Sequence, residues 1–236
     1  ENAFLELSNN KQFDEDAIMA GYYRDIYESN GKLKLSQSVL MDNMQITEHK
    51  ELIRVIPQID RRRGFSFAWN KLYKAEVIKK NGIGFSDKQF GEDYDFNIVF
   101  FQKARSLRVL NKAFYHYVKK NTESLTEKYV PDFFGINKDR FEKMKVLMEQ
   151  NDLYQEEIKA TILSAYVKHV MAAITRLYDK RAKLSDWQRR RLVKEMLEVE
   201  LSKEAILYAK PKGGNEIICN VIFKMQNITL LLLFGK

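Results

Sequence analysis

The hydrophobic pattern of the sequence changes once along the chain. Up to about residue 120, short apolar or alternating runs separated by turn residues mix with helical stretches, a pattern typical of an α/β fold. Beyond about residue 126, every periodic stretch has the spacing of an amphipathic helix. We therefore predict an α/β domain over residues 1–126 and an all-α domain over residues 127–236.

The first part begins with the pattern of a β-hairpin. Residues 17–27 are rich in Ile and Tyr and are predicted to form a strand. Asn30 and Gly31 follow, and this pair is a strong two-residue hairpin signal. A partner strand is expected from Leu33.

Helices and strands alternate in the rest of the first part. A helix is expected from Thr47, which can accept a hydrogen bond at a helix start, to Pro57, which cannot continue a helix. A second helix is predicted over residues 69–80, because Asn81 and Gly82 form a typical helix stop. The remaining expected elements are a helix over residues 92–105 and strands over residues 107–110 and 113–118.

Composition excludes several classes of protein. Cys219 is the single cysteine and there are three histidines, so no disulfide and no zinc spacing can be assembled, and the chain is typical of a cytosolic protein. The net charge of +8 suits a polyanionic ligand or an anionic membrane. No nucleic-acid-binding motif accompanies this charge, so we exclude nucleic acid as a partner.

The start of the chain carries neither a charged leader nor an apolar segment. We therefore expect no signal peptide here, and we expect the chain to be part of a longer protein.

Three short motifs carry the chemistry, in a fixed order. Trp69-Asn70-Lys71-Leu72-Tyr73 is followed by Gly91-Glu92-Asp93-Tyr94-Asp95-Phe96 and then by Tyr115-His116-Tyr117, which leads to Asn121-Thr122-Glu123-Ser124. This ordered set resembles the acceptor half of family 2 glycosyltransferases, and the resemblance covers roughly residues 10–126. In that family the first two motifs begin helices and the third lies in a strand.

The resemblance implies a GT-A fold, a nucleoside-diphosphate sugar as donor and inversion at the anomeric carbon. The elements that bind the nucleotide, including the strand that ends in a metal-binding Asp-x-Asp, are expected upstream of Glu1. The chain would then be a partial GT-A fold without its nucleotide-binding half, and inactive alone. A divalent metal, Mg²⁺ or Mn²⁺, is expected for the whole enzyme, with its ligands outside this chain.

Sugar transfer needs a base that takes the proton from the acceptor hydroxyl, and a carboxylate can do this. The resemblance assigns this role to Asp93 and gives Glu92 the role of orienting the site. Two carboxylates at a helix start also interact favourably with the helix dipole, so a purely structural role stays open.

The same motifs supply the expected substrate contacts. Trp69 could stack on the acceptor sugar, with Asn70 and Lys71 bonding to hydroxyls or a phosphate; a buried tryptophan with no ligand is the alternative. The resemblance places three further residues at the substrate site: Asp95, Tyr117 and Ser124.

Other polar residues receive structural interpretations. His116 alternates with apolar neighbours in its strand and is predicted to be a core histidine rather than a ligand. The strings Asp14-Glu15-Asp16 and Asp93-Tyr94-Asp95 are not assigned to a metal. The first leads into a strand, whereas a metal-binding pair should end one.

Residues 215–236 form the most apolar stretch, crossed by a polar stripe of Glu216, Asn220, Lys224 and Asn227. This pattern predicts one amphipathic helix, which lies in an anionic membrane interface with residues 230–234 deepest or docks on its own domain.

The sequence thus predicts a glycosyltransferase that acts on a polysaccharide or lipid-linked glycan at the cytoplasmic face of the membrane. The alternative is a non-catalytic module that binds carbohydrate or a membrane.

Overall fold

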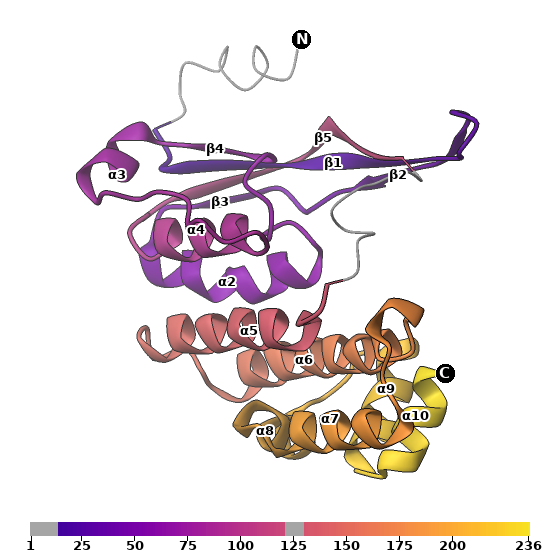
Figure 1. Ribbon diagram of the computed structural model, residues 1–236. Helices are drawn as coiled ribbons and strands as arrows, with labels where there is room; N and C mark the ends of the chain where they lie inside the picture. Colours follow the sequence, from indigo (N-terminus) through magenta and orange to yellow (C-terminus); the bar gives the residue numbers. More distant parts are fainter. Residues whose placement is uncertain (1–13, 121–129) are drawn as a thin grey trace. The chain divides into compact units, whose positions relative to one another are not determined.

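The computed structural model describes residues 14–120 and 130–236. The chain divides into two compact units, Glu1–Lys128 and Tyr129–Lys236 (Figure 1). The first unit combines a β-sheet with helices, and the described residues of the second unit form helices without strands. The predicted mixed α/β character of the chain is confirmed.

The sheet of the first unit is organised around a long, buried strand. β1 (Ala17–Tyr27) pairs in parallel with β5 (Leu107–Lys120), and β5 pairs antiparallel with the short β3 (Met44–Ile46). On its other edge β1 pairs antiparallel with β2 (Leu33–Val39) and with β4 (Lys71–Tyr73). A parallel pair needs a long crossover connection, and the helices between β1 and β5 lie in that connection.

The predicted β-hairpin is confirmed. β1 and β2 lie where the sequence places them, and between them the amide of Glu28 donates to the carbonyl of Lys32 at 2.9 Å. Gly31 has a φ of 81°, a backbone angle that glycine adopts without steric cost.

The described residues of the first unit also form three helices: α2 (His49–Arg61), α3 (Ala75–Lys80) and α4 (Glu92–Phe101). Figure 1 shows α2 and α4 on one side of the sheet. Their apolar faces form a core with β1 and β5 that includes Met19, Leu52, Ile53, Ile56, Phe65, Phe100, Phe101 and Leu107.

The predicted limits of α2 are wrong at both ends. Glu48 rather than Thr47 precedes the helix, and Pro57 lies inside it. Ile56, Pro57 and Ile59 are all buried, so continuing the helix removes apolar surface from water. This gain outweighs the single hydrogen bond that the proline cannot donate.

The prediction of one helix over residues 69–80 is wrong in its first half. Lys71–Tyr73 form β4, because Lys71 pairs with Met19 and Tyr73 pairs with Ala17 at the edge of β1. Only Ala75–Lys80 are helical, and the helix ends at Asn81 as predicted. The Trp69 motif therefore leads into a strand rather than a helix.

Two further limits differ from prediction. α4 ends at Phe101, before the predicted residue 105. The two strands expected between residues 107 and 118 are a single strand, β5, whose register against β1 shifts between Ala20 and Tyr22. An irregularity of this kind bends a strand without ending it.

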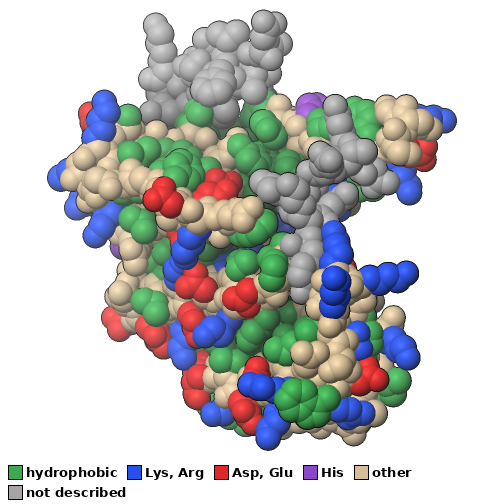
Figure 2. All heavy atoms as spheres, viewed as in Figure 1, with side chains coloured by type: hydrophobic (Ala, Val, Ile, Leu, Met, Phe, Trp, Pro, Cys, Tyr) green, Lys and Arg blue, Asp and Glu red, His purple; other side chains and the backbone are tan. Residues whose placement is uncertain are grey.

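The second unit is built around α6 (Glu156–Arg176), the helix with the most buried residues. It contacts α5 (Phe133–Glu149), α8 (Glu200–Tyr208) and the last two helices. Its side chains Ile162, Tyr166, Val170 and Ile174 are buried, as the helical spacing predicts. On the face that Figure 2 shows, acidic and basic side chains are interspersed.

The helical pattern over residues 187–201 is interrupted. α7 (Asp186–Glu198) and α8 are separated by Val199, whose backbone is extended. Trp187, in the first turn of α7, is exposed.

The C-terminal stretch is also two helices rather than one. α9 (Asn215–Lys224) and α10 (Ile228–Gly235) are separated by Gln226, which has a φ of 51°. The carboxamide of Asn227 then accepts from the amide of Leu230 at 3.1 Å and begins α10. Among the described helices, none has the length and apolar character needed to cross a membrane.

Candidate functional site

A loop between α2 and β4, residues 64–68, is fixed by hydrogen bonds from buried polar side chains. The ammonium of Lys71 donates to the carbonyls of Gly64 at 2.9 Å and Phe65 at 3.1 Å, and also to the carbonyl of Phe67. It donates as well to the side-chain oxygen of Asn70 at 2.8 Å, and the Asn70 amide donates to Gly64 at 3.1 Å. Four acceptors surround one buried cation, which fixes the loop.

Asn97 holds the same loop from α4. Its side-chain amide donates to the carbonyls of Phe65 at 2.7 Å and Phe67 at 3.2 Å, while its side-chain oxygen accepts from the hydroxyl of Tyr73 at 2.6 Å. Sequence reasoning missed Asn97. The available signal is its spacing of four from Asp93, which places both residues on one face of α4.

Burial shifts the pKa values of Lys71 and Tyr73, which belong to this network. It lowers the pKa of Lys71 to about 7, although the charges of Asp93 and Asp60 act in the opposite direction. Burial, together with the charge of Asp93, raises the pKa of Tyr73. Tyr73 is therefore a stable hydroxyl donor to Asn97 at neutral pH.

Stacked aromatic rings lie beside this loop. The ring of Trp69 stacks on Tyr115, Phe67 and Tyr117 with centroid distances of 4.4, 4.8 and 5.5 Å, and it meets the edge of Tyr22 at 4.9 Å. Tyr115 is 44% exposed, so it presents an aromatic surface to ligands. The alternation of Tyr115 and Tyr117 in β5 is the sequence signal for this cluster.

Asp93 lies in the first turn of α4 and is half-buried. Its Oδ2 accepts from the amide of Ala68 at 3.2 Å, and Ala68 directly precedes Trp69. The structure therefore brings together two of the predicted site residues, a carboxylate and a stacked aromatic ring, at the end of one fixed loop.

The other predicted site residues are placed differently. Asn70 and Lys71 are buried with their polar atoms bonded inside the chain. Asp95 pairs with Lys88 at 2.9 Å, and Glu92 is half-buried in the same helical turn. Tyr117 belongs to the aromatic cluster, whereas Ser124 lies outside the described residues. The substrate contacts expected of these residues remain predictions.

The prediction that His116 is a core histidine is wrong, because its side chain is exposed. Its Nδ1 lies 2.7 Å from Oδ2 of Asp25, and its ring stacks on Tyr23. Asp25 also accepts from the hydroxyl of Ser36 at 2.6 Å; these two hydrogen bonds lower the pKa of the Asp25 carboxyl. Because side chains alternate along β5, His116 points away from the face that carries Tyr115 and Tyr117.

Within residues 14–120 and 130–236, no three His, Cys, Asp or Glu side chains come together as a metal site. In the string of residues 14–16, Asp14 pairs with Lys74, Glu15 pairs with Arg108, and Asp16 accepts from the amide of Arg105. The three acids are thus bonded to three different partners.

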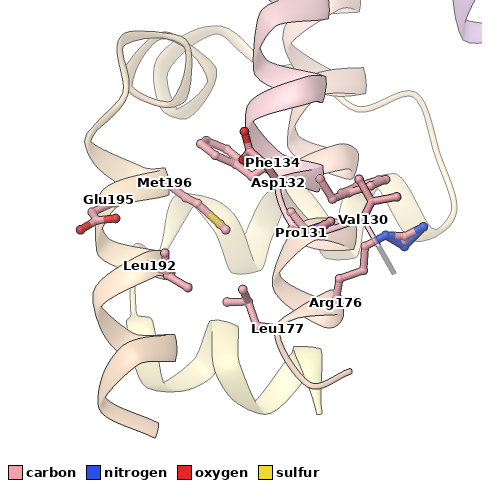
Figure 3. Close-up of a pocket in the computed structure, with 11 residues that line it drawn as sticks. Val130, Pro131, Asp132, Phe134, Arg176, Leu177, Leu192, Glu195 and Met196 are labelled. Atoms are coloured by element: carbon pink, nitrogen blue, oxygen red, sulfur yellow. The ribbon is translucent and has the colours of Figure 1, made fainter. Parts of the chain in front are cut away.

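The second unit contains a cavity of about 230 Å³ between the start of α5, the end of α6 and the second half of α7. Figure 3 shows Leu177 and Leu192 at its walls, and Met196 lines it from α7. The walls are mainly apolar, and none of the site residues predicted from the sequence contributes to them.

Comparison with known proteins places this geometry in context. No protein-family model matches the chain. Over 113 residues, or 48% of its length, the chain is 26% identical to the uncharacterized glycosyltransferase EpsJ of Bacillus subtilis (strain 168), and the match covers 31% of that protein. The chain is glycosyltransferase-like.

The fold of the chain is similar to that of solved structures. The crystal structure of S. aureus TarS 1–349 in complex with UDP-GlcNAc matches 99% of this chain with a TM-score of 0.50 and 14% sequence identity. The complex of the same protein with UDP gives a TM-score of 0.52 and 16% identity. The glycosyltransferase-like chain spans 62% and 61% of these two TarS chains, and 31% of EpsJ.

Proposed function

We propose that the chain is the acceptor-side part of an inverting family 2 glycosyltransferase with a GT-A fold. The whole enzyme transfers a sugar from a nucleoside-diphosphate sugar to a hydroxyl of a polysaccharide or lipid-linked glycan. One observation carries this proposal: the Asp93 carboxylate accepts a hydrogen bond from Ala68, the residue that precedes Trp69, and the ring of Trp69 stacks on the exposed ring of Tyr115.

The geometry of Asp93 suits a general base. Oδ2 is occupied by the amide of Ala68, and no other described residue forms a hydrogen bond to this carboxylate. Oδ1 can therefore take the proton of the acceptor hydroxyl as the hydroxyl oxygen bonds to the anomeric carbon. The bond from that carbon to the diphosphate breaks in the same step, and its electron pair leaves with the diphosphate. A single displacement of this kind inverts the anomeric centre.

The aromatic cluster positions the acceptor. A sugar ring that lies on the exposed face of Tyr115, with Trp69 stacked behind it, is held near the loop that anchors Asp93. The buried network of Lys71 and Asn97 keeps that loop rigid, so the geometry exists before substrate binds.

The donor is proposed to be a uridine-diphosphate sugar, because the TarS complexes contain UDP-GlcNAc and UDP. Mg²⁺ or Mn²⁺, held by residues outside this chain, would neutralise charge on the leaving diphosphate. We place the enzyme in the cytoplasm, on the inner face of the membrane.

A carbohydrate-binding module without catalysis is the second candidate, and the stacked aromatic rings favour it. A transfer screen of the full-length protein separates the two functions. Nucleotide sugars, beginning with UDP-GlcNAc, are supplied with and without Mn²⁺, and released nucleotide is measured. Turnover with at least one donor is expected, whereas glycan binding without turnover of any donor would favour the binding module.

A further inference from the structure

The last two helices expose a group of large apolar side chains, which we name the C-terminal patch. It comprises six residues that are between 41% and 65% exposed: Ile217, Ile218 and Val221 of α9, Met225 directly after α9, and Leu233 and Phe234 of α10. α9 and α10 contact each other. Large groups of exposed apolar side chains mark interaction surfaces more often than free surface.

The orientation of α9 is the reverse of what its sequence favours. Its buried residues are Cys219, Asn220 and Phe223, so an amide is packed inside while aliphatic side chains face outward. Each residue of an α-helix is rotated by about 100° about the helix axis relative to the one before it. With this rotation, an arc of about 100° contains Ile217, Ile218, Val221 and Met225. The exposed face of α9 is therefore a continuous apolar stripe.

Basic residues outnumber acidic ones in this part of the sequence. Between residues 207 and 236 the sequence contains Lys210, Lys212, Lys224 and Lys236, but Glu216 is the only acidic residue. Apolar side chains beside an excess of lysine suit a surface that is apolar inside and anionic at its boundary, as in a bilayer with acidic lipids.

We propose that the C-terminal patch binds the surface of an anionic lipid membrane, with α9 and α10 lying in the interface. This inference goes beyond the proposed transfer reaction and does not depend on it. A second copy of the chain is a poorer occupant, because a symmetric interface on this patch would bring the same lysines together. This arrangement differs from the single amphipathic helix predicted from the sequence. In that helix the polar stripe that includes Asn220 would face water, whereas Asn220 is buried in the structure.

Vesicle sedimentation tests the proposal on the full chain. Phosphatidylcholine vesicles with and without phosphatidylglycerol are used, and the fraction of bound protein is measured against lipid concentration. We expect binding only when phosphatidylglycerol is present. Changing Ile218, Val221 and Met225 together to Gln should weaken this binding about tenfold or more, because three apolar side chains no longer leave water.

A pair of valines provides the matched control. Val221 and Val146 are both helical and about half exposed, but only Val221 belongs to the C-terminal patch. Val221→Gln should weaken vesicle binding about threefold, whereas Val146→Gln should leave it unchanged. Circular dichroism and thermal melting confirm that each variant is folded.

Three results would overturn the proposal. The first is no sedimentation of the unmodified chain with either kind of vesicle. The second is equal binding by the unmodified chain and the folded triple variant. The third is concentration-dependent dimerisation that the triple variant abolishes, without vesicle binding, which would identify a second copy as the occupant.

Discussion

Asn97 in the first unit and Asn220 in the second are both almost completely buried, but their surroundings differ. Each polar atom of the Asn97 side chain has a hydrogen-bond partner, and the partners belong to the loop beside Asp93 or to Tyr73. The Asn220 amide donates only to its own helix, and its side-chain oxygen has no partner among the described residues. The Asn97 side chain fixes a loop. Burial of the Asn220 side chain is unfavourable and follows from the orientation in which α9 packs.

The two units therefore illustrate two kinds of binding surface, one with a fixed backbone and one with exposed apolar side chains. In the first unit, buried polar groups fix the backbone, and the groups that face a substrate are few. In the second unit, the apolar side chains of α9 remain outside while an amide is buried. A rigid site suits chemistry that needs fixed distances, whereas an exposed apolar face suits a partner without fixed shape.

The largest effect expected from this contrast concerns the packing of α9. Phe223 is fully buried, whereas Met225 of the same helical stretch is exposed. Phe223→Ala should lower the free energy of unfolding by about 3–4 kcal/mol because it leaves a cavity. Met225→Ala should change it by no more than about 0.5 kcal/mol. Urea unfolding measures both, and similar losses would mean that α9 is not oriented as described.

The two asparagines should differ in the same direction by a smaller amount. Asn97→Ala removes three hydrogen bonds and leaves two loop carbonyls and a hydroxyl without that partner, so a loss of about 2–3 kcal/mol is expected. Asn220→Ala should cost about 1 kcal/mol or less, because its oxygen has no described partner to lose. Equal losses in urea unfolding would remove the contrast between the two units.

The pH dependence of stability sharpens the description of the buried network. The pKa of Lys71 is lowered to about 7 in the folded chain, whereas an unfolded lysine titrates near about 10.4. Between these values the folded state binds fewer protons, so the free energy of unfolding should rise with pH. The carbonyl acceptors favour the ammonium, so we expect a slope of below about 1 kcal/mol per pH unit.

The control for this measurement is Lys71→Met, which removes the titrating group. Urea unfolding of both proteins at about pH 7, 8 and 9 gives the difference in slope. A positive difference is expected. Identical slopes would mean that the four acceptors hold Lys71 fully charged in the folded state.

The sequence predicted the parts of the fold that local patterns determine. The strand at residues 17–27, the Asn30-Gly31 turn and the helix stop at Asn81 follow from backbone preferences of neighbouring residues. The strand at Lys71–Tyr73 could not be predicted in this way. It exists because β1 offers a free edge to it, and that edge is formed by residues more than fifty positions away.

The residues of the candidate site also fall into two groups, those that the sequence motifs identify and those that depend on contacts in the folded chain. The motifs identify Asp93, Trp69 and Tyr117 as residues of interest, and the structure places them around one loop. The buried role of Lys71 and the contribution of Asn97 depend on carbonyl groups in that loop, which have no signature in a sequence. The prediction for His116 is wrong because alternation shows which residues share a face of a strand but not whether that face is covered.

Asp93 is proposed as the general base, and Asp93→Asn in the full-length protein is the decisive variant. The asparagine oxygen can still accept from the amide of Ala68, so stability should fall by no more than about 1 kcal/mol. Asp132→Asn is the matched control, since Asp132 also lies at a helix start and accepts from a backbone amide, that of Gly135 at 2.9 Å. Transfer rate and melting temperature are measured side by side for both variants. We expect a loss in rate of about a hundred- to ten-thousand-fold for Asp93→Asn and a near-normal rate for Asp132→Asn. An Asp93→Asn protein that retains more than about a tenth of the normal rate would contradict the assignment, because even weak base catalysis exceeds that loss.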